Sequence, residues 1–375
     1  MEQTISNYSL LRLLGRGGMG SVYEARHTTI ERRAAIKILH KEFCEDPDVV
    51  KRFMNEARAV NIIGHPGLVS VSEFGQTADG APYIVMEYIE GITLREHLQR
   101  AGGRLPAEQV VRLSRQMAST LAAAHGKQIV HRDLKPVNIM LVQGDPDGDS
   151  GEPDRVKILD FGIAKLATET ASQTKSGILM GTPTYMSPEQ CRSGRSAVDR
   201  SDVYALGVIM YEMLTGEPPF RGGPAVLMAA HLMQEPAPLA KLAPGTPPEL
   251  CALIHRMLAK NPSDRPPATE VARCLAPLSG QLTPPPSLLA PAALAGAAAP
   301  AGPPGDEQAT VLKQAAAPTA APRPAAPVPL NRKLLGLAAL LVLLLGLAGG
   351  LLALRLRRRG DASMHGSRRV PAESG

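Results

Sequence analysis

Hydrophobic and polar residues follow two different periods along the first 276 residues of the chain. Residues 21–26, SVYEAR, alternate as a half-buried strand does, and residues 34–39, AAIKIL, form the apolar run of a buried strand. The later run Val49–Ile63 has the apolar spacing of a helix. The pattern therefore predicts an N-terminal region in which strands come first and a helix follows.

The pattern changes at Pro277. Of the 54 residues from Pro277 to Leu330, 13 are Pro and 16 are Ala. Such a segment cannot bury enough apolar surface to offset the entropy lost on ordering, so we expect a disordered linker with polyproline II character. The folded domain is therefore expected within residues 8–276, and the linker within residues 277–330.

An apolar stretch follows the linker. Leu334–Leu354 contains 21 residues without a charged side chain, and basic residues flank it on both sides. At 1.5 Å per residue, a helix of this length spans roughly 30 Å, the thickness of the hydrocarbon core of a lipid bilayer. We expect a single transmembrane helix over residues 334–354 and a short basic tail over residues 355–375. The alternative, a buried core helix, lacks a domain around it.

The net charge of +6 comes from the C-terminal region. Residues 331–375 carry eight basic and two acidic side chains, whereas residues 1–276 carry 31 of each sign. A nucleic-acid-binding domain normally has excess basic charge on its folded part, so we expect no nucleic-acid partner. The four scattered cysteines have no metal-ligand spacing and fit a reducing compartment.

Three glycines form the first motif with chemical meaning. Gly15, Gly17 and Gly20 have G-x-G-x-x-G spacing, and Val22 follows two residues later. Dinucleotide-binding folds share this spacing but continue into a helix, whereas here a strand-like segment follows. A strand, a glycine turn and a second strand can lie over phosphate groups, because glycine permits close approach of the backbone. A plain glycine-rich hairpin is the alternative.

A lysine occupies the second predicted strand. Lys37 lies between Ile36 and Ile38, and Glu56 in the helical run is placed where it could pair with this lysine. An ammonium group that is held by a carboxylate while it contacts the α- and β-phosphates is an arrangement that phosphoryl transfer uses. The alternative is a lysine that extends from a strand edge into water.

The strongest chemical pattern lies in IVHRDLKPVNIML and VKILDFG. Phosphoryl transfer needs an acceptor for the hydroxyl proton, positive charge near the transferred group and oxygen ligands for Mg²⁺. We expect Asp133 to act as base and positioner and Lys135 to steady the transferred phosphate. Asn138 and Asp160 are expected to hold the metal. The residue types in these two motifs, with their spacing and order, form a set that chance does not explain.

These motifs, in this order, resemble those of the bacterial eukaryotic-like (Hanks-type) Ser/Thr protein kinases. The resemblance covers residues 8–276 and implies a two-lobed α+β fold. Residues 8–86 would form a small antiparallel β lobe plus one helix, and residues 87–276 a larger helical lobe. The resemblance also implies transfer of the γ-phosphate of ATP to Ser or Thr hydroxyls of protein substrates, with Mg²⁺, or alternatively Mn²⁺, as cofactor.

The resemblance assigns further residues to the nucleotide site. Met86 corresponds to the gatekeeper, and the hinge residues Glu87 and Ile89 would read adenine through their backbone. Four apolar side chains would enclose the base: Leu14, Val22, Ala35 and Met140.

The resemblance also assigns structural and selective roles in the larger lobe. Glu189 of the SPE motif is expected to pair with Arg265, and Asp202 is expected to brace the catalytic loop. Lys135 and Thr182 match positions at which Ser/Thr kinases differ from tyrosine kinases.

The segment that follows the DFG motif offers a switch. Arg132 precedes Asp133, and the resemblance implies that such an arginine binds an activation-loop phosphate with two hydrogen bonds. Thr174 and Ser176, counted back from Gly181, resemble paired autophosphorylation sites. The alternative is a polar loop that is never modified.

The location follows from the chemistry and from the apolar stretch. Met1–Leu10 is polar, so we expect no signal peptide, and the kinase domain is expected at the cytoplasmic face of the membrane. Counting basic flanking residues favours the opposite orientation, with a cytoplasmic tail. Gly346 and Gly350 form a small-residue face that would allow a homodimer, against the alternative of a simple anchor.

One segment departs from the resemblance, because an acidic insert over residues 143–155 replaces a tight turn. We expect this insert to be disordered and to leave catalysis unaffected. Two rival functions are a membrane-anchored pseudokinase scaffold and a kinase for small molecules. The complete set of catalytic residues argues against the scaffold, and the SPE motif argues against the small-molecule kinase.

Overall fold

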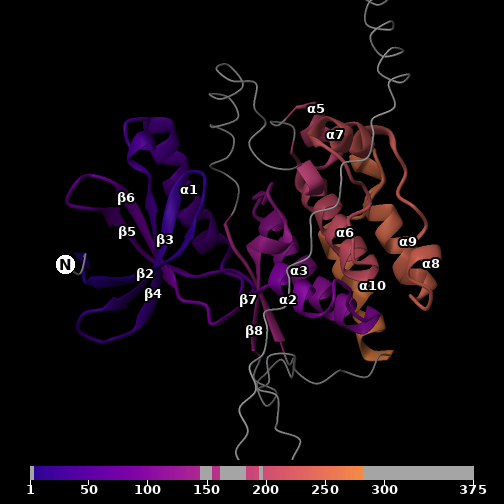
Figure 1. Ribbon diagram of the computed structural model, residues 1–375, viewed down its shortest axis with the longest axis horizontal. Coiled ribbons are helices and arrows are strands. Elements are labelled where there is room, and N and C mark those ends of the chain that lie inside the picture. Colours follow the sequence, from indigo (N-terminus) through magenta and orange to yellow (C-terminus); the bar gives the residue numbers. More distant parts are fainter. Residues whose placement is uncertain (1–3, 144–153, 161–182, 194–196, 282–375) are drawn as a thin grey trace, which may run out of the picture. The chain divides into compact units, whose positions relative to one another are not determined.

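The computed structural model describes residues 4–143, 154–160, 183–193 and 197–281. They form an N-terminal lobe of strands with one long helix and a C-terminal lobe made mainly of helices (Figure 1). The two-lobed fold expected from the sequence is confirmed. The activation segment over residues 161–182, most of the linker and the apolar stretch at residues 334–354 lie outside the described residues. Residues 144–153 of the acidic insert also lie outside them, but its ends, Gln143 and Asp154 with Arg155, belong to strands, so the prediction of a disordered insert is wrong at both ends.

The N-terminal lobe is built on a six-stranded antiparallel sheet in the order β1-β2-β3-β4-β6-β5. Gly15 pairs with Val22, and Val22 pairs with Lys37, so the side chains of Val22 and Lys37 share one face of the sheet. The strands are β1 (Thr4–Ile5), β2 (Tyr8–Arg16), β3 (Gly20–His27), β4 (Arg33–Leu39), β5 (Val71–Gln76) and β6 (Pro82–Glu87).

The helix α1 (Pro47–Ile63) packs on the sheet. It begins two residues before the predicted run because the Asp46 side chain accepts hydrogen bonds from the backbone of Asp48 and Val49, and it ends at Gly64, whose φ is 62°. Its buried Val49, Phe53 and Ala57 form one apolar cluster with Leu39 and Ile84. This packing fixes the helix face that carries Glu56.

The C-terminal lobe combines a small sheet with a bundle of helices. The sheet holds β7 (Gly91–Thr93), β8 (Ile139–Gln143) and β9 (Asp154–Ile158), in that order. The helices are α2 (Leu94–Arg100), α3 (Ala107–Gly126), α5 (Pro188–Arg192), α6 (Asp199–Thr215), α7 (Pro224–Met233), α8 (Leu239–Leu242), α9 (Pro248–Met257) and α10 (Ala268–Gln281). The short 3-10 turns are η1 (Lys41–Phe43), η2 (Pro136–Asn138), η4 (Pro183–Tyr185) and η5 (Pro262–Asp264).

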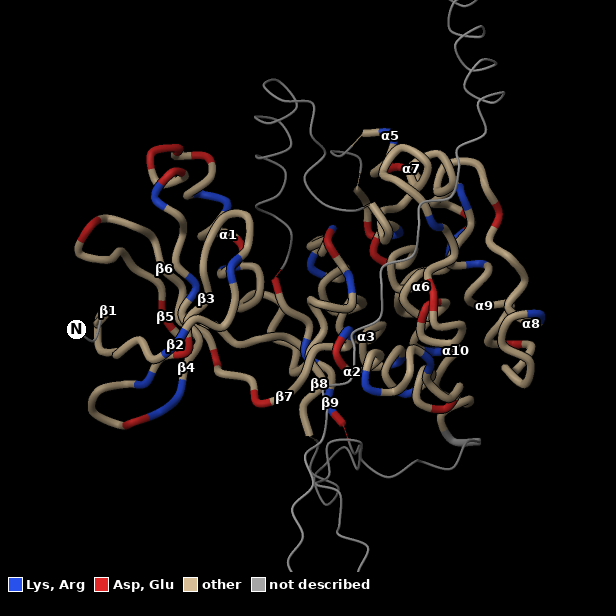
Figure 2. The backbone as a smooth tube through the Cα atoms, in the orientation of Figure 1, with Lys and Arg blue, Asp and Glu red and all other residues tan. Residues whose placement is uncertain are grey.

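The core of this lobe surrounds α6. Every residue from Ser201 to Thr215 is buried, so this helix is enclosed on all sides by its neighbours. In Figure 2, acidic and basic positions are mixed over both lobes, and neither lobe carries a single sign of charge. This distribution agrees with the balanced charge of residues 1–276.

The folded part ends later than composition suggests. The helix α10 passes through Pro277 and ends at Gln281, so the first five residues assigned to the linker are helical. Leu278 packs against the core beyond the proline, which explains why the helix continues. Among the helices of the described residues, none has both the length and the apolar character that a bilayer span requires.

Candidate active site

The glycine motif forms the turn of the hairpin between β2 and β3, as predicted. The Gly17 amide donates to the Gly20 carbonyl at 2.9 Å. A Cβ atom added at Gly15 would meet no atom within 4 Å, whereas one at Gly20 would lie 2.5 Å from the Ile38 carbonyl oxygen. Gly20 is therefore required by close packing on β4. The backbone at Gly15 leaves open space, which is what a phosphate group needs, whereas a Cβ atom at Gly17 would lie 3.5 Å from the Gly20 carbonyl oxygen.

Lys37 joins elements from both lobes. Its Nζ lies 3.2 Å from Glu56 Oε1 in α1 and 2.8 Å from Asp160 Oδ1, just after β9. The predicted pairing with Glu56 is confirmed, and the contact with Asp160 is an addition. Burial opposes the charge on Lys37, but the attraction of Asp160 and Glu56 outweighs it, so the pKa of Lys37 lies above its usual value. Lys37 is therefore charged at neutral pH.

The two carboxylates respond differently to this lysine. Burial is the largest influence on Glu56, ahead of the attraction of Lys37, and it raises the pKa of Glu56. For Asp160 burial also acts upward, but the charge and hydrogen bond of Lys37 prevail and lower the pKa of Asp160. Asp160 thus holds its negative charge, and it has a φ of 41°, in the left-handed region.

The catalytic loop brings three of the predicted residues together. Lys135 Nζ lies 2.9 Å from Asp133 Oδ2. Asn138 Nδ2 donates to the carbonyl of Asp133 at 2.9 Å and to its Oδ2 at 3.3 Å. The Leu159 amide donates to the Asn138 carbonyl at 2.8 Å, which ties this loop to the residue before Asp160. The residues expected to accept a proton, to supply positive charge and to hold a metal are thus joined in one connected unit.

Asp202 of α6 braces the catalytic loop through hydrogen bonds to its backbone, as predicted. Its Oδ2 accepts from the His131 amide and from His125 Nε2, and its Oδ1 accepts from the Arg132 amide, each at 2.8 Å. Arg132 has a φ of 70°, a left-handed conformation that a non-glycine residue adopts only when its surroundings hold it. The sequence analysis did not single out His125 or His131. The fully buried His131 also donates from Nε2 to the Leu159 carbonyl at 2.9 Å.

The residues expected around the base come from both lobes. Ala35 of β4 lies opposite Met86 of β6 in the register, and Met140 of β8 lies opposite Thr93 of β7. Leu14, in contrast, is 40% exposed at the outer end of β2. Ile89 lies in the segment that connects β6 to β7.

Glu87 at the start of the hinge has a contact that sequence analysis missed. Its Oε1 accepts from Lys157 Nζ of β9 at 2.6 Å and from the Ser70 amide at 2.8 Å. Its own amide donates to the Ser70 carbonyl at 3.0 Å. The side chain thus fixes the hinge, while the backbone remains the part assigned to adenine.

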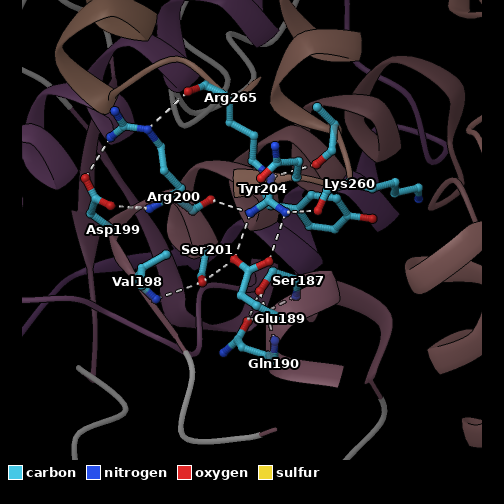
Figure 3. A network of polar contacts seen from close by, with 12 residues as sticks. Ser187, Glu189, Gln190, Val198, Asp199, Arg200, Ser201, Tyr204, Lys260 and Arg265 are labelled. Carbon is cyan, nitrogen blue, oxygen red and sulfur yellow. Dashed lines mark hydrogen bonds and ion pairs between the residues drawn. The ribbon is translucent and has the colours of Figure 1, made fainter. Parts of the chain in front are cut away.

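The SPE motif is anchored by a buried ion pair, shown in Figure 3. Arg265 Nη1 and Nη2 donate to the two carboxylate oxygens of Glu189 at 2.8 and 2.9 Å, which confirms the predicted pair. The same guanidinium donates to the carbonyls of Arg200, Lys260 and Ala259, so all five of its N–H groups are used. Burial opposes ionisation of Glu189, but Arg265 and Ser201 lower its pKa.

The residues predicted for the switch and for the metal site lie before the activation segment and within it. Thr174, Ser176 and Thr182 lie outside the described residues. Arg132 Nε is buried and has no hydrogen-bond partner within the described part of the chain, although the Arg132 carbonyl accepts from Gln190 Nε2 at 2.8 Å. Within the same residues no group of three or more His, Cys, Asp or Glu side chains forms a metal cluster. Asn138 and Asp160 supply the hard oxygen atoms that Mg²⁺ prefers.

A strand lobe with a glycine hairpin, a helical lobe with a braced catalytic loop, and a lysine that links them define a two-lobed fold of the protein kinase class. The chain belongs to the protein kinase domain family, which it matches over residues 8–274.

Bacterial proteins are among the relatives with this domain. The chain is 45% identical over 260 residues to the serine/threonine-protein kinase Pkn1 of Myxococcus xanthus, covering 69% of this chain and 36% of Pkn1. It is 41% identical over 299 residues to PknA of Mycobacterium tuberculosis, covering 76% of this chain and 66% of PknA. The crystal structure of the PknI kinase domain from the same organism gives a TM-score of 0.56 at 27% identity, covering 74% of this chain and 98% of that one. The chain thus spans little more than a third of the length of Pkn1.

Proposed function

We propose that this chain is a Ser/Thr protein kinase that transfers the γ-phosphate of ATP to hydroxyl groups of protein substrates. The observation that carries the proposal is Lys37 Nζ within hydrogen-bond distance of both Glu56 and Asp160. A strand, a helix and the expected metal ligand meet at one charged group. Relatives that share the domain are named serine/threonine-protein kinases, which supports the same conclusion.

The residues of the site have distinct tasks in this reaction. Asp133 orients the substrate hydroxyl and accepts its proton, while Lys135, 2.9 Å from Asp133, stabilises charge on the transferred group. Lys37 holds the α- and β-phosphates. Asn138 and Asp160 would hold Mg²⁺ or Mn²⁺, which supplies positive charge to the phosphate oxygens when bound.

The nucleotide would lie under the glycine hairpin. Gly15 offers open backbone to the phosphates, and we assign Gly17 and Gly20 to the same turn. Ala35 and Met86 lie side by side in the sheet at the position assigned to the base. We assign Leu14, Val22 and Met140 to the remaining walls, and the backbone of Glu87 and Ile89 to adenine.

Autophosphorylation of the activation segment would regulate the enzyme. Arg132 supports this proposal, because its buried Nε has no partner within the described residues and would be satisfied by a phosphate. We assign the phosphate to Thr174 or Ser176, and acceptor selectivity to Thr182 together with Lys135.

Residues 334–354 would anchor the domain at the cytoplasmic face of the membrane, and Gly346 with Gly350 would allow pairing of two chains. The apolar length of the stretch supports the anchor. Membrane fractionation of the full chain beside residues 1–281 tests it. Recovery of both forms in the soluble fraction would contradict the proposal.

The Asp133→Asn variant tests the catalytic assignment. Transfer of labelled phosphate from MgATP to a basic protein should fall by about 10²–10⁴-fold, because the proton acceptor is lost while the phosphate contacts remain. Nucleotide affinity should be retained.

Mass spectrometry of the wild type beside the Asp133→Asn variant tests autophosphorylation, and it should find phosphate on Thr174 or Ser176 in the active chain alone. A folded wild type that incorporates no phosphate would favour a scaffold, and transfer to metabolites alone would favour a small-molecule kinase.

A further inference from the structure

A buried carboxylate in the sheet binds arginines from the strands on both sides. Glu24 of β3 accepts from Arg12 Nε of β2 at 2.7 Å and from Arg33 Nε of β4 at 3.0 Å, and a second nitrogen of Arg33 lies 2.8 Å from the same carboxylate. The Glu24 side chain is 8% exposed, whereas Arg12 is 63% exposed. Glu24 is therefore the centre of this cluster, and the arginines extend outward from it.

The same two arginines contact the hinge. Strand pairing between β4 and β6 ends where Ala34 lies opposite Glu87, and Tyr88 follows without a place in the strand register. The Arg33 guanidinium carbon lies 3.9 Å from the centroid of the Tyr88 ring, and Arg12 Nη2 donates to the Tyr88 hydroxyl at 3.3 Å. Arg33 also forms an ion pair with Glu90. Side chains thus hold the hinge at the point where strand pairing stops.

The cluster lies next to the position assigned to the base. Arg12 lies opposite Glu24, Glu24 opposite Ala35, and Ala35 opposite Met86 in consecutive register pairs. Residues that face each other in this way share one side of a sheet. The carboxylate is therefore one strand away from the alanine and two strands away from the gatekeeper methionine.

The charge of Glu24 is what allows the arrangement. Two guanidinium groups that converge on one tyrosine repel each other unless an anion lies between them. Burial opposes ionisation of Glu24, but the hydrogen bonds from Arg33 and Arg12 outweigh it and hold the pKa of Glu24 below its usual value. Glu24 therefore remains an anion at neutral pH, and both arginines can approach the hinge.

We propose that Glu24 is a positioning residue for nucleotide binding, which acts through Arg33 and Arg12 on the hinge at Tyr88. The inference rests on the proposed function, since it takes the hinge as the site that reads adenine. A neutral residue at position 24 removes the anion that holds both arginines beside Tyr88, and their mutual repulsion then moves them away from the ring. The hinge then samples other conformations, and nucleotide affinity falls while the catalytic loop is unchanged.

The Glu24→Gln variant tests this role, because it keeps the shape of the side chain and removes its charge. The KM for ATP should rise by about tenfold, the loss expected for a weakened cation–π contact with its hydrogen bonds, and kcat should change by less than about twofold. The Kd of a fluorescent ATP analogue, measured without turnover, should rise in parallel. Asp79→Asn is the matched control, since Asp79 pairs with Lys41 in the same lobe.

A double-mutant cycle shows whether Glu24 acts through the hinge. Tyr88→Leu alone should weaken nucleotide binding, and adding Glu24→Gln should weaken it little further, because both changes remove the same connection. If Glu24→Gln does not fold, Arg33→Lys provides the test, since lysine keeps the charge but loses the planar stacking on Tyr88. A multiplicative effect in the cycle, or an unchanged Kd in a folded variant, would overturn the inference. A wild type that binds the analogue but transfers no phosphate would contradict the proposed function instead.

Discussion

The protein has two clusters in which a basic side chain binds a carboxylate, and the two clusters differ in where the partners come from. In the C-terminal lobe, Arg265 has a fully buried side chain, and one carboxylate and three carbonyl oxygens use all of its donors. In the cleft, Lys37 faces two carboxylates, Glu56 and Asp160, which come from different lobes.

The difference between the pairs separates a structural role from a functional one. Every contact of Arg265 comes from one lobe and leaves no donor for another partner. The two anions of Lys37 arrive on separate elements, and in the proposed function phosphate oxygens also bind this lysine. The number and origin of the partners, rather than the strength of the charges, therefore distinguish the two sites.

The largest effect is expected from breaking the structural pair. Glu189→Gln would leave the Arg265 charge buried without a counterion and should lower the free energy of unfolding by about 3–5 kcal/mol. Urea unfolding measures this change. Glu270→Gln is the control, because Glu270 forms a pair with Arg256 that is 53% exposed on the arginine side, and it should cost less than about 1 kcal/mol. Equal losses in the two variants would contradict the distinction.

Breaking the functional pair should affect the reaction instead of the fold. Lys37→Met should reduce turnover by at least about a hundredfold, equivalent to about 3 kcal/mol, because the phosphate contacts are lost. The free energy of unfolding should change by less than about 1 kcal/mol, since the raised pKa of Glu56 allows it to protonate. Steady-state kinetics and urea unfolding of the same preparation test both statements. A variant that unfolds as readily as Glu189→Gln would show that Lys37 is structural.

Acid should destabilise the C-terminal lobe through a buried histidine that is part of neither ion pair. His231, fully buried beside Tyr204, has a pKa of about 4, lowered first by burial and then by the charge of Lys260. The His231 side chain takes up a proton near pH 6.5 in the unfolded chain and near pH 4 in the folded chain. Its contribution to the free energy of unfolding is therefore fully present above pH 6.5 and decreases as the pH falls from 6.5 to 4. From pH 7 to 5 the loss attributable to His231 should be about 2 kcal/mol.

The control for this titration is the His231→Gln variant, which cannot protonate at that position. Its free energy of unfolding should decrease less between pH 7 and 5 than that of the wild type, by the same margin of about 2 kcal/mol. Parallel pH profiles for the two proteins would show that another group is responsible.

Sequence reasoning recovered the contacts that motifs encode. The pairs Lys37–Glu56 and Glu189–Arg265, and the bracing by Asp202, follow from residue types at fixed spacing. The β2–β3 hairpin could be predicted because alternation after the glycines excludes a helix.

The contacts that sequence reasoning missed depend on register and on distant segments. Lys157 reaches Glu87 across 70 residues, and Glu24 reaches Arg12 and Arg33 only because three strands align in one register. No local pattern encodes such an alignment. The boundary between the folded domain and the linker was predicted at Pro277, four residues before the end of α10, because composition identifies the proline but not the packing of Leu278 beyond it.

The short loop after α1 has a mechanical consequence. The Gly67 carbonyl accepts from the Ile158 amide of β9 at 2.8 Å, the Leu68 carbonyl accepts from Lys157 at 3.0 Å, and a Cβ atom at Gly67 would lie 2.1 Å from Thr120 Oγ1 of α3. Hydrogen bonds and close packing thus hold the loop after α1 on the helical lobe, while the body of the helix packs on the sheet. Because α1 carries Glu56 and the sheet carries Lys37, a shift of the sheet relative to the loop after α1 would act on the contact between these two residues.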